Sequence, residues 1–118
     1  MSIKTQDYQA HFDDVNAKIT LSGSLRLNAA PEYQPISELM DAASVIAQQR
    51  SPALLTLDLT ELRFLNSSGI NLLYQFVLKV KKQGGVALRV LGSNSNAWQP
   101  KSLSNMVKFM PTLELVMS

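Results

Sequence analysis

The sequence predicts one α/β domain over residues 1–118, built on a mixed β-sheet with helices packed mainly on one side. Two short alternating patterns near the start of the chain predict a β-hairpin. After them, helix-periodic segments alternate with short apolar runs that are typical of buried parallel strands. The chain has 118 residues, of which 46% are hydrophobic, so it can bury a core, and no linker or internal repeat divides it.

The hairpin is expected to pair residues 8–12 with residues 19–27 across a turn at residues 13–16. Gly23 interrupts the second strand, which indicates a bulge or a close approach of another backbone segment.

A polar stretch with two prolines, residues 28–35, is interpreted as a loop and as a second candidate surface. Pro35 is expected to be the first residue of a helix, because proline suits that position. This helix should end before Ser51-Pro52, since a residue that precedes proline disfavours helical backbone.

The centre of the chain is expected to form a strand over residues 54–59 and then a long helix. The helix should start within residues Asn66–Ser68, because Asn and Ser side chains cap free backbone N–H groups. Gly84-Gly85 marks its end. The apolar stripe that should face the core consists of Ile70, Leu73, Tyr74, Val77 and Val80.

The last part of the chain predicts a strand at residues 86–91, a loop at 92–96, a short helix at 100–109 and a final strand at 113–116. The turn after the central strand would lie at the edge where parallel strands end. Open α/β sheets commonly place their contacts with ligands and partners at that edge.

The central turn places Ser67 and Ser68 at the positive end of a helix, where anions are well tolerated. A phosphoryl group there would add roughly −1.5 to −2 charge close to free N–H groups. Phosphorylation is therefore expected to change the surface and to leave the fold intact. From the local pattern alone, an ordinary helix cap is the favoured interpretation of these residues.

The segment Asp58–Ile70 (DLTELRFLNSSGI) resembles the signature of STAS domains, the group that contains bacterial anti-sigma factor antagonists and the cytoplasmic domains of sulfate transporters. A weaker similarity extends to Ile19–Leu25, where Ser24 stands at a position that is commonly Glu. In the regulatory members the first residue of the Ser-Ser or Ser-Thr pair is the phosphoacceptor, which carries over to Ser67. Asn66 stands where the family usually has Asp.

The resemblance implies a STAS-like fold and a non-enzymatic regulator of transcription that works by partner switching. An anti-sigma factor or related serine kinase would bind the unphosphorylated surface, and a phosphatase would reset it. Leu72 and Phe76 are expected to lie off the main apolar stripe and to be available for contacts. The predicted partner-binding residues are Ser24, Asn66, Ser67, Ser68, Gly69, Asn71, Leu72, Gln75 and Phe76.

Asn66 also motivates an alternative. A constitutive STAS-like adaptor or ligand-sensing domain, for example one associated with a transporter, would bind a larger assembly without phosphorylation of Ser67.

Composition leaves few kinds of chemistry open. The net charge is only +2, so we expect no direct binding of nucleic acid. The absence of cysteine excludes thiolate metal sites and disulfides. His11 is the sole histidine, so no catalytic residue, metal site or cofactor is expected. No apolar run approaches the length of a membrane span, and a cytoplasmic protein without membrane insertion is expected. Trp98 is expected to pack a loop against the core.

Overall fold

Seven strands form one mixed sheet, and three helices pack against it, in a computed structural model that describes residues 1–118. The elements in chain order are β1 (Ser2–Lys4), β2 (Tyr8–Asp13), β3 (Lys18–Leu25), α1 (Ala30–Gln48), β4 (Leu54–Asp58), β5 (Leu62–Leu65), α2 (Ser67–Gln83), β6 (Ala87–Gly92), α3 (Gln99–Phe109) and β7 (Glu114–Met117).

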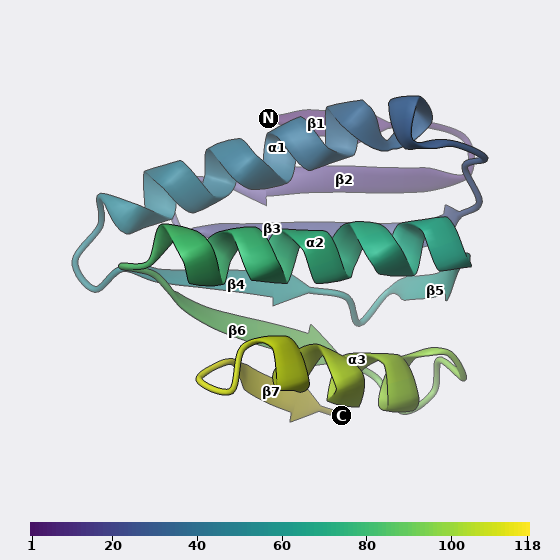
Figure 1. The fold of residues 1–118 in the computed structure, drawn as a ribbon. Coiled ribbons are helices and arrows are strands. Elements are labelled where there is room, and N and C mark those ends of the chain that lie inside the picture. Colours follow the sequence, from purple (N-terminus) through teal and green to yellow (C-terminus); the bar gives the residue numbers. More distant parts are fainter.

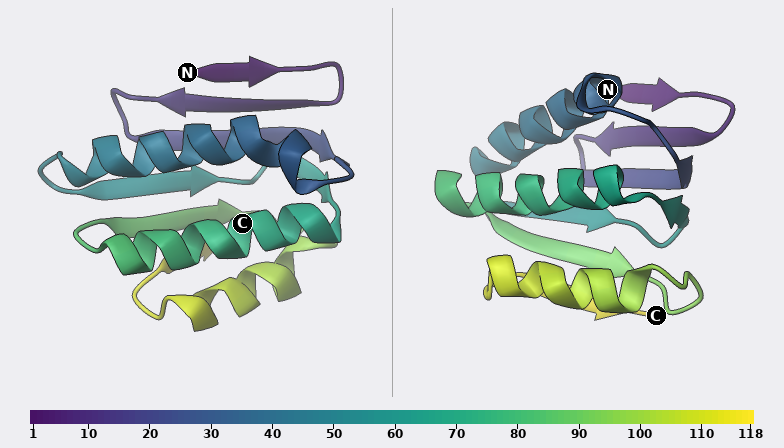
Figure 2. Two further views of the ribbon diagram at one scale, coloured as in Figure 1. Left: turned by 45° about the horizontal axis from the view of Figure 1, so that its top comes forward. Right: turned by 45° about the vertical axis from the view of Figure 1, so that its right-hand side comes forward.

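The sheet has the strand order β1-β2-β3-β4-β6-β7, and β5 pairs with β3 beyond the end of β4. The first three strands are antiparallel, whereas β3, β4, β6 and β7 are parallel. All three helices cover the same face of the sheet (Figures 1 and 2). The predicted mixed sheet, with parallel later strands and helices on one side, is confirmed.

The core lies between the sheet and the helices, as the alternating burial along the strands shows. Leu55 and Leu57 of β4 are fully buried, whereas Thr56 between them faces the uncovered side of the sheet and is half-buried. The uncovered face is polar and carries two ion pairs, Lys18–Asp58 at 3.3 Å and Arg89–Glu114 at 3.3 Å. One face of the sheet therefore forms the core, and the other remains open to solvent.

The predicted turns and caps are confirmed where the backbone tests them. Asp13 Oδ1 accepts hydrogen bonds from the N–H groups of Val15 and Asn16 in the hairpin turn. Gly23 has φ +88°, and a Cβ there would lie 2.4 Å from the carbonyl oxygen of Asp7, so the predicted close backbone approach is real. α2 ends at Gln83, and Gly84, with φ +71°, is its C-cap.

The predicted start of the first helix is wrong. α1 begins at Ala30, so most of the expected loop at residues 28–35 is helical, and Pro35 lies inside the helix. A proline in the helix interior removes one backbone hydrogen bond. Tyr33 and Ile36 are 3% and 0% exposed, and burial of these large side chains outweighs the lost bond.

Two strands were not predicted. β1 has only three residues, and its single inward side chain, Ile3, is too little for an alternating pattern to be visible. β5 has no alternating pattern, because its ends, Leu62 and Leu65, are buried while its two middle residues are exposed.

The buried side of α2 is wider than predicted. Leu73, Val77 and Val80 are buried as expected, and Ile70 and Tyr74 are half-buried. Phe76 was expected off the apolar stripe, yet it is 3% exposed and belongs to the core. The reason is that α2 packs against both the sheet and α1, which buries a second strip of its surface.

None of the three helices is both long and apolar enough to cross a membrane.

Candidate functional site

The candidate site lies at the edge of the sheet where the parallel strands end and where all three helices begin (Figure 1). α2 starts at Ser67, directly after β5, and its first turn carries most of the residues predicted from the sequence. The β3–α1 connection, residues 26–29, reaches the same edge. Two segments that are distant in sequence therefore meet around the Asn66–Gly69 turn.

Asn66 is the N-cap of α2 and joins these segments through its side chain. Its Oδ1 accepts hydrogen bonds from Gly69 N at 3.0 Å and from the hydroxyl of Tyr33 at 2.6 Å. Its Nδ2 donates to the carbonyl oxygen of Leu27 at 2.8 Å. The predicted helix start within Asn66–Ser68 is confirmed, with Asn66 as the cap. The contacts of Asn66 with Tyr33 and Leu27 were not predicted.

Ser67 and Ser68 are exposed on the first turn of α2. Neither hydroxyl takes part in the hydrogen bonds within the protein, so both are accessible from solvent. Backbone N–H groups in the first turn of a helix have no acceptor one turn earlier, and the helix dipole places partial positive charge there. An acceptor or an anion attached to Ser67 would therefore meet favourable donors.

Gly69 allows the turn to approach its neighbours closely. A Cβ at this position would lie 2.1 Å from Leu65 Cδ1 and 3.1 Å from the hydroxyl oxygen of Tyr33. Since Leu65 and Tyr33 are both buried, neither can move away freely. Gly69 therefore serves packing, and as a buried residue it offers little surface to a partner.

A groove of about 260 Å³ runs between α1 and α2, next to this turn. Its floor is partly apolar, and its rim carries hydroxyl and amide groups. Five predicted residues line it, Ser68, Asn71, Leu72, Gln75 and Phe76; the remaining lining residues are Ala30, Tyr33, Gln34, Ser37, Met40 and Lys79. The structure thus brings together the predicted α2 residues and a wall of α1.

The α1 wall of the groove was missed because its first turns were interpreted as a loop. Ala30, Tyr33, Gln34, Ser37 and Met40 recur at the spacing i, i+3, i+4, i+7 and i+10, which is one face of a helix. Because Gln34 and Ser37 are polar, this face shows no apolar period in the sequence, and the two prolines favoured a loop.

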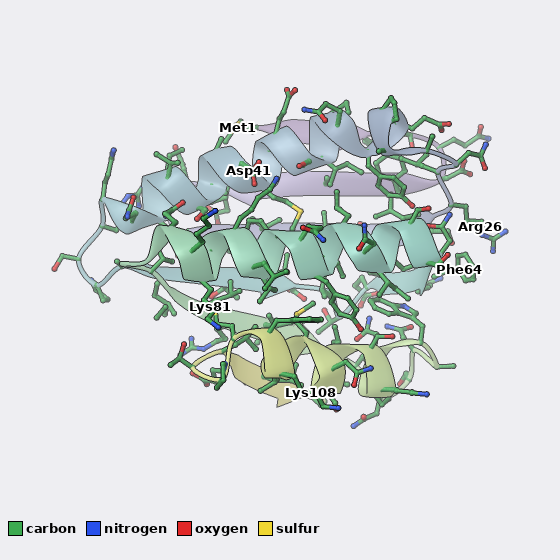
Figure 3. The ribbon with its side chains drawn as sticks, in the orientation of Figure 1. Met1, Arg26, Asp41, Phe64, Lys81 and Lys108 are labelled. Carbon is green, nitrogen blue, oxygen red and sulfur yellow. The ribbon has the colours of Figure 1, made fainter.

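Ser24 lies apart from the groove. It pairs with Phe64 of β5 and lines a separate hollow of about 300 Å³ together with Asp7, Tyr8, Arg26 and Leu27. The guanidinium carbon of Arg26 lies 4.5 Å from the centre of the Phe64 ring, and the two side chains project from the same end of the molecule in Figure 3. The structure therefore does not bring Ser24 together with the predicted α2 residues.

The two helices that form the groove differ in charge. α1 carries Glu32, Glu38 and Asp41 and no Lys or Arg, whereas α2 carries three lysines and no Asp or Glu. Lys79 and Asp41 join the two helices through an ion pair of 3.2 Å. Burial raises the pKa of Tyr33 above its ordinary value. Tyr33 is therefore a neutral donor at neutral pH.

The histidine and the tryptophan lie outside the groove. His11 Nδ1 is 2.6 Å from Ser2 Oγ, in a pair that lies on the uncovered side of the sheet. Trp98 Nε1 donates to the carbonyl oxygen of Leu62 at 2.9 Å, which confirms that Trp98 packs a loop against the core. The groove itself contains neither a histidine nor a cysteine.

No family model and no curated protein matches the sequence. Among solved structures, the chain is similar over 99% of its length to 97% of a chain in the complex of diguanylate cyclase SiaD with its activator SiaC from Pseudomonas aeruginosa, with a TM-score of 0.71 and 16% identity. SiaC of Pseudomonas aeruginosa matches at a TM-score of 0.62 and 16% identity, covering 98% of this chain and 92% of that one. Apo-SiaC from Pseudomonas aeruginosa matches at a TM-score of 0.64 and 13% identity, covering 100% and 97%. These similarities show the fold.

Proposed function

We propose that this protein is a non-enzymatic regulator that binds a signalling protein through the groove and the adjoining first turn of α2, and that phosphorylation of Ser67 weakens this binding. The observation that carries the proposal is the position of Ser67. Its exposed hydroxyl lies one residue before Ser68, which lines the groove. A change of charge at Ser67 therefore occurs at the end of the binding surface.

Two independent similarities support a partner that is itself a signalling protein. The motif around Ser67 resembles that of anti-sigma factor antagonists, whose partner is an anti-sigma factor or related serine kinase, with a phosphatase that resets the switch. The fold is similar to that of SiaC, which is described as the activator of diguanylate cyclase SiaD. In both cases the protein acts by binding another one.

The groove suits a protein partner because it combines apolar area with orienting polar groups. Leu72 is half-buried and supplies apolar surface, whereas Met40 and Phe76 are 0% and 3% exposed and form the buried bottom of the groove. The exposed side chains of Asn71 and Gln75 supply amide donors and acceptors. Apolar burial gives affinity, and the amides select a partner that satisfies them.

The switch follows from charge. A kinase would transfer the terminal phosphoryl group of a nucleoside triphosphate to Ser67 Oγ, with loss of the hydroxyl proton, and a phosphatase would hydrolyse the ester with water. The added charge of about −1.5 to −2 must be desolvated when the partner docks, and it repels any carboxylate opposite it. Because Ser67 is at the surface of an intact helix terminus, the fold should persist.

The test compares Ser67→Ala with Ser67→Asp as bait in the native host, with quantitative mass spectrometry of the captured proteins. A partner held by Ser67→Ala should bind Ser67→Asp at least about tenfold more weakly, which corresponds to about 1.4 kcal/mol. Ser104→Asp is the matched control, since Ser104 is exposed on α3 and does not line the groove. It should retain the partner fully.

Equal capture by the Ala and Asp variants contradicts the switch. The identity of the captured protein separates the two classes of partner, since a kinase-like or anti-sigma protein agrees with the motif and a nucleotide cyclase agrees with the fold.

A constitutive adaptor is the second candidate, and the contacts of Asn66 favour it. The hydrogen bonds of Asn66 to Tyr33, Leu27 and Gly69 give the Asn66–Gly69 turn a structural role that needs no phosphorylation. Intact-mass and peptide mass spectrometry of the native protein decides between the candidates. Phosphate on Ser67 supports the switch, whereas an unmodified chain under several growth conditions supports the adaptor.

A further inference from the structure

The side chain of Asn66 connects the turn that carries Ser67 to a wall of the groove. Its Oδ1 accepts from both Gly69 N and the Tyr33 hydroxyl, and Tyr33 lines the groove. Its Nδ2 donates a hydrogen bond to the carbonyl oxygen of Leu27, which lies just before α1 begins. Asn66 is thus bonded to α2, to α1 and to the segment that leads into α1.

We propose that Asn66 is a positioning residue and a displaceable cap: a negative charge on Ser67 takes over the donors that Asn66 holds and thereby releases Tyr33 in the groove wall. The inference rests on the proposed function, because it explains how the state of Ser67 reaches the groove. Besides repelling a partner directly, the charge on Ser67 would then also weaken binding by changing the conformation of the groove wall.

The displacement follows from competition for the same donors. A phosphoryl group on the residue after Asn66 brings three strong acceptor oxygens to the first turn of α2. Hydrogen bonds to a charged acceptor are roughly twice as strong as those between neutral groups. The neutral amide oxygen of Asn66 is therefore the weaker acceptor for the N–H of Gly69.

Tyr33 then has to change its position. Its side chain is 3% exposed, and a buried hydroxyl without a hydrogen-bond partner is unfavourable. The Tyr33 hydroxyl therefore follows the new acceptor or turns toward the groove, and either movement changes the groove wall. No side chain at Gly69 separates Tyr33 from the turn, since a Cβ there would lie 3.1 Å from the Tyr33 oxygen.

The amide is better suited to this role than a carboxylate at the same position. A carboxylate would hold the Gly69 N–H with a full charge, would repel a phosphoryl group on Ser67 and would have no hydrogen to donate to the Leu27 carbonyl. The difference between Asn66 and the aspartate of STAS-like motifs therefore favours a cap that yields when Ser67 becomes charged.

The test follows tyrosine ring signals by NMR in the intact protein with ¹³C-labelled tyrosine. The chain has three tyrosines, and Tyr74 is the internal reference, because its hydroxyl donates to the carbonyl oxygen of Ser102 at 2.9 Å. Ser67→Asp should shift the signal of Tyr33 and leave that of Tyr74 in place. Phosphorylated protein, where a kinase is in hand, should give the same shift with larger amplitude.

The decisive comparison repeats the substitution in an Asn66→Ser background. Serine keeps an N-cap acceptor for α2, so the variant should fold, but it lacks the amide that reaches Tyr33 and Leu27. In this background Ser67→Asp should no longer shift Tyr33. If Asn66→Ser fails to fold, Tyr33→Phe replaces it, and the effect of Ser67→Asp on the affinity for the captured partner should then shrink by several-fold.

The outcomes separate this inference from the proposed function. The displaceable cap is overturned if Ser67→Asp does not shift the Tyr33 signal, or if the shift is equal with and without Asn66. This holds even if Ser67→Asp still abolishes capture of the partner. A Tyr33 shift that depends on Asn66, together with unchanged partner capture, supports the displaceable cap and contradicts the proposed switch.

Discussion

At the scale of single residues, Asp58 and Gly69 determine how the chain leaves β4 and enters α2. Asp58 ends β4, and its Oδ1 accepts from the amide and the hydroxyl of Thr60 at 3.0 and 2.6 Å. Lys18 Nζ lies 3.3 Å from Oδ2. Burial alone would raise the pKa of Asp58, but the hydrogen bonds from Thr60 and Lys18 together hold it below its ordinary value.

The carboxylate of Asp58 should therefore stabilise the fold in a pH-dependent way. A lowered pKa in the folded state means that the stabilisation is present above the unfolded pKa of about 4 and is lost as the pH falls through the folded value. Asp58→Asn should lower the free energy of unfolding at pH 7 by roughly 0.5–1.5 kcal/mol. Urea titrations between pH 7 and pH 2 measure this.

In those titrations the difference between wild type and Asp58→Asn should shrink at acid pH. Asp14→Asn is the control, because Asp14 is exposed and forms no hydrogen bond through its side chain. A difference that stays constant down to pH 2 would contradict the assignment.

Gly69→Ala tests the close packing of the α2 start. Alanine is normally favoured over glycine in a helix by about 1 kcal/mol. Here the new methyl group would overlap the Leu65 side chain, so we expect a net loss of about 1–3 kcal/mol instead. Chemical denaturation measures the change, and Ser68→Ala, the exposed neighbouring position, should change stability by less than about 0.5 kcal/mol.

At the scale of elements, hydrogen bonds from the start of α3 hold the β4–β5 connection. Gln99 is fully buried, and its Nε2 donates to the carbonyl oxygens of Leu59 and Leu62 at 2.7 and 3.1 Å. Its Oε1 accepts from Ser93 N at 2.7 Å. The indole of Trp98 adds a bond to the Leu62 carbonyl at 2.9 Å. The segment before Ser67 is thereby held from the side opposite to α1.

Gln99→Leu should remove the side-chain hydrogen bonds of residue 99 while keeping a side chain of similar volume. The partner groups are left without their hydrogen bonds in the interior, which should cost about 2 kcal/mol or more. Hydrogen exchange should rise at residues 59–65 before it rises at the hairpin strands β2 and β3. Gln6→Leu, an exposed glutamine, serves as the control and should leave the exchange pattern unchanged.

At the scale of the whole molecule, the two faces have different roles. The helices cover one face of the sheet, and no element covers the other face (Figure 2). The groove lies between two of these helices. Because the chain has no cysteine, any introduced thiol is a unique probe of one face. Two exposed glutamines allow a matched comparison, Gln75 in the groove and Gln9 on the uncovered face.

A partner bound in the groove should protect the thiol introduced by Gln75→Cys from alkylation and should not protect the thiol introduced by Gln9→Cys. The partner captured by Ser67→Ala is the probe, and the rate of alkylation is followed by intact mass. Protection of the second thiol alone would place the interface on the uncovered face of the sheet and contradict the groove.

The sequence by itself determined the elements whose signals are local. The alternation in β2 and β3, the period of α2, its cap at Asn66 and its end at Gly84 depend on neighbours within a few residues, so they are visible in the chain. The parallel order of the later strands follows from helices that connect them. The motif around Ser67 was visible for the same reason.

Only the tertiary structure decided the features that depend on which distant surfaces meet. Packing of Tyr33 and Ile36 started α1 at Ala30 despite Pro35, and contact with α1 buried Phe76. The same packing formed the groove and left Ser24 outside it. These outcomes are set by the apolar area buried between elements far apart in sequence, and no local period of residues encodes that area.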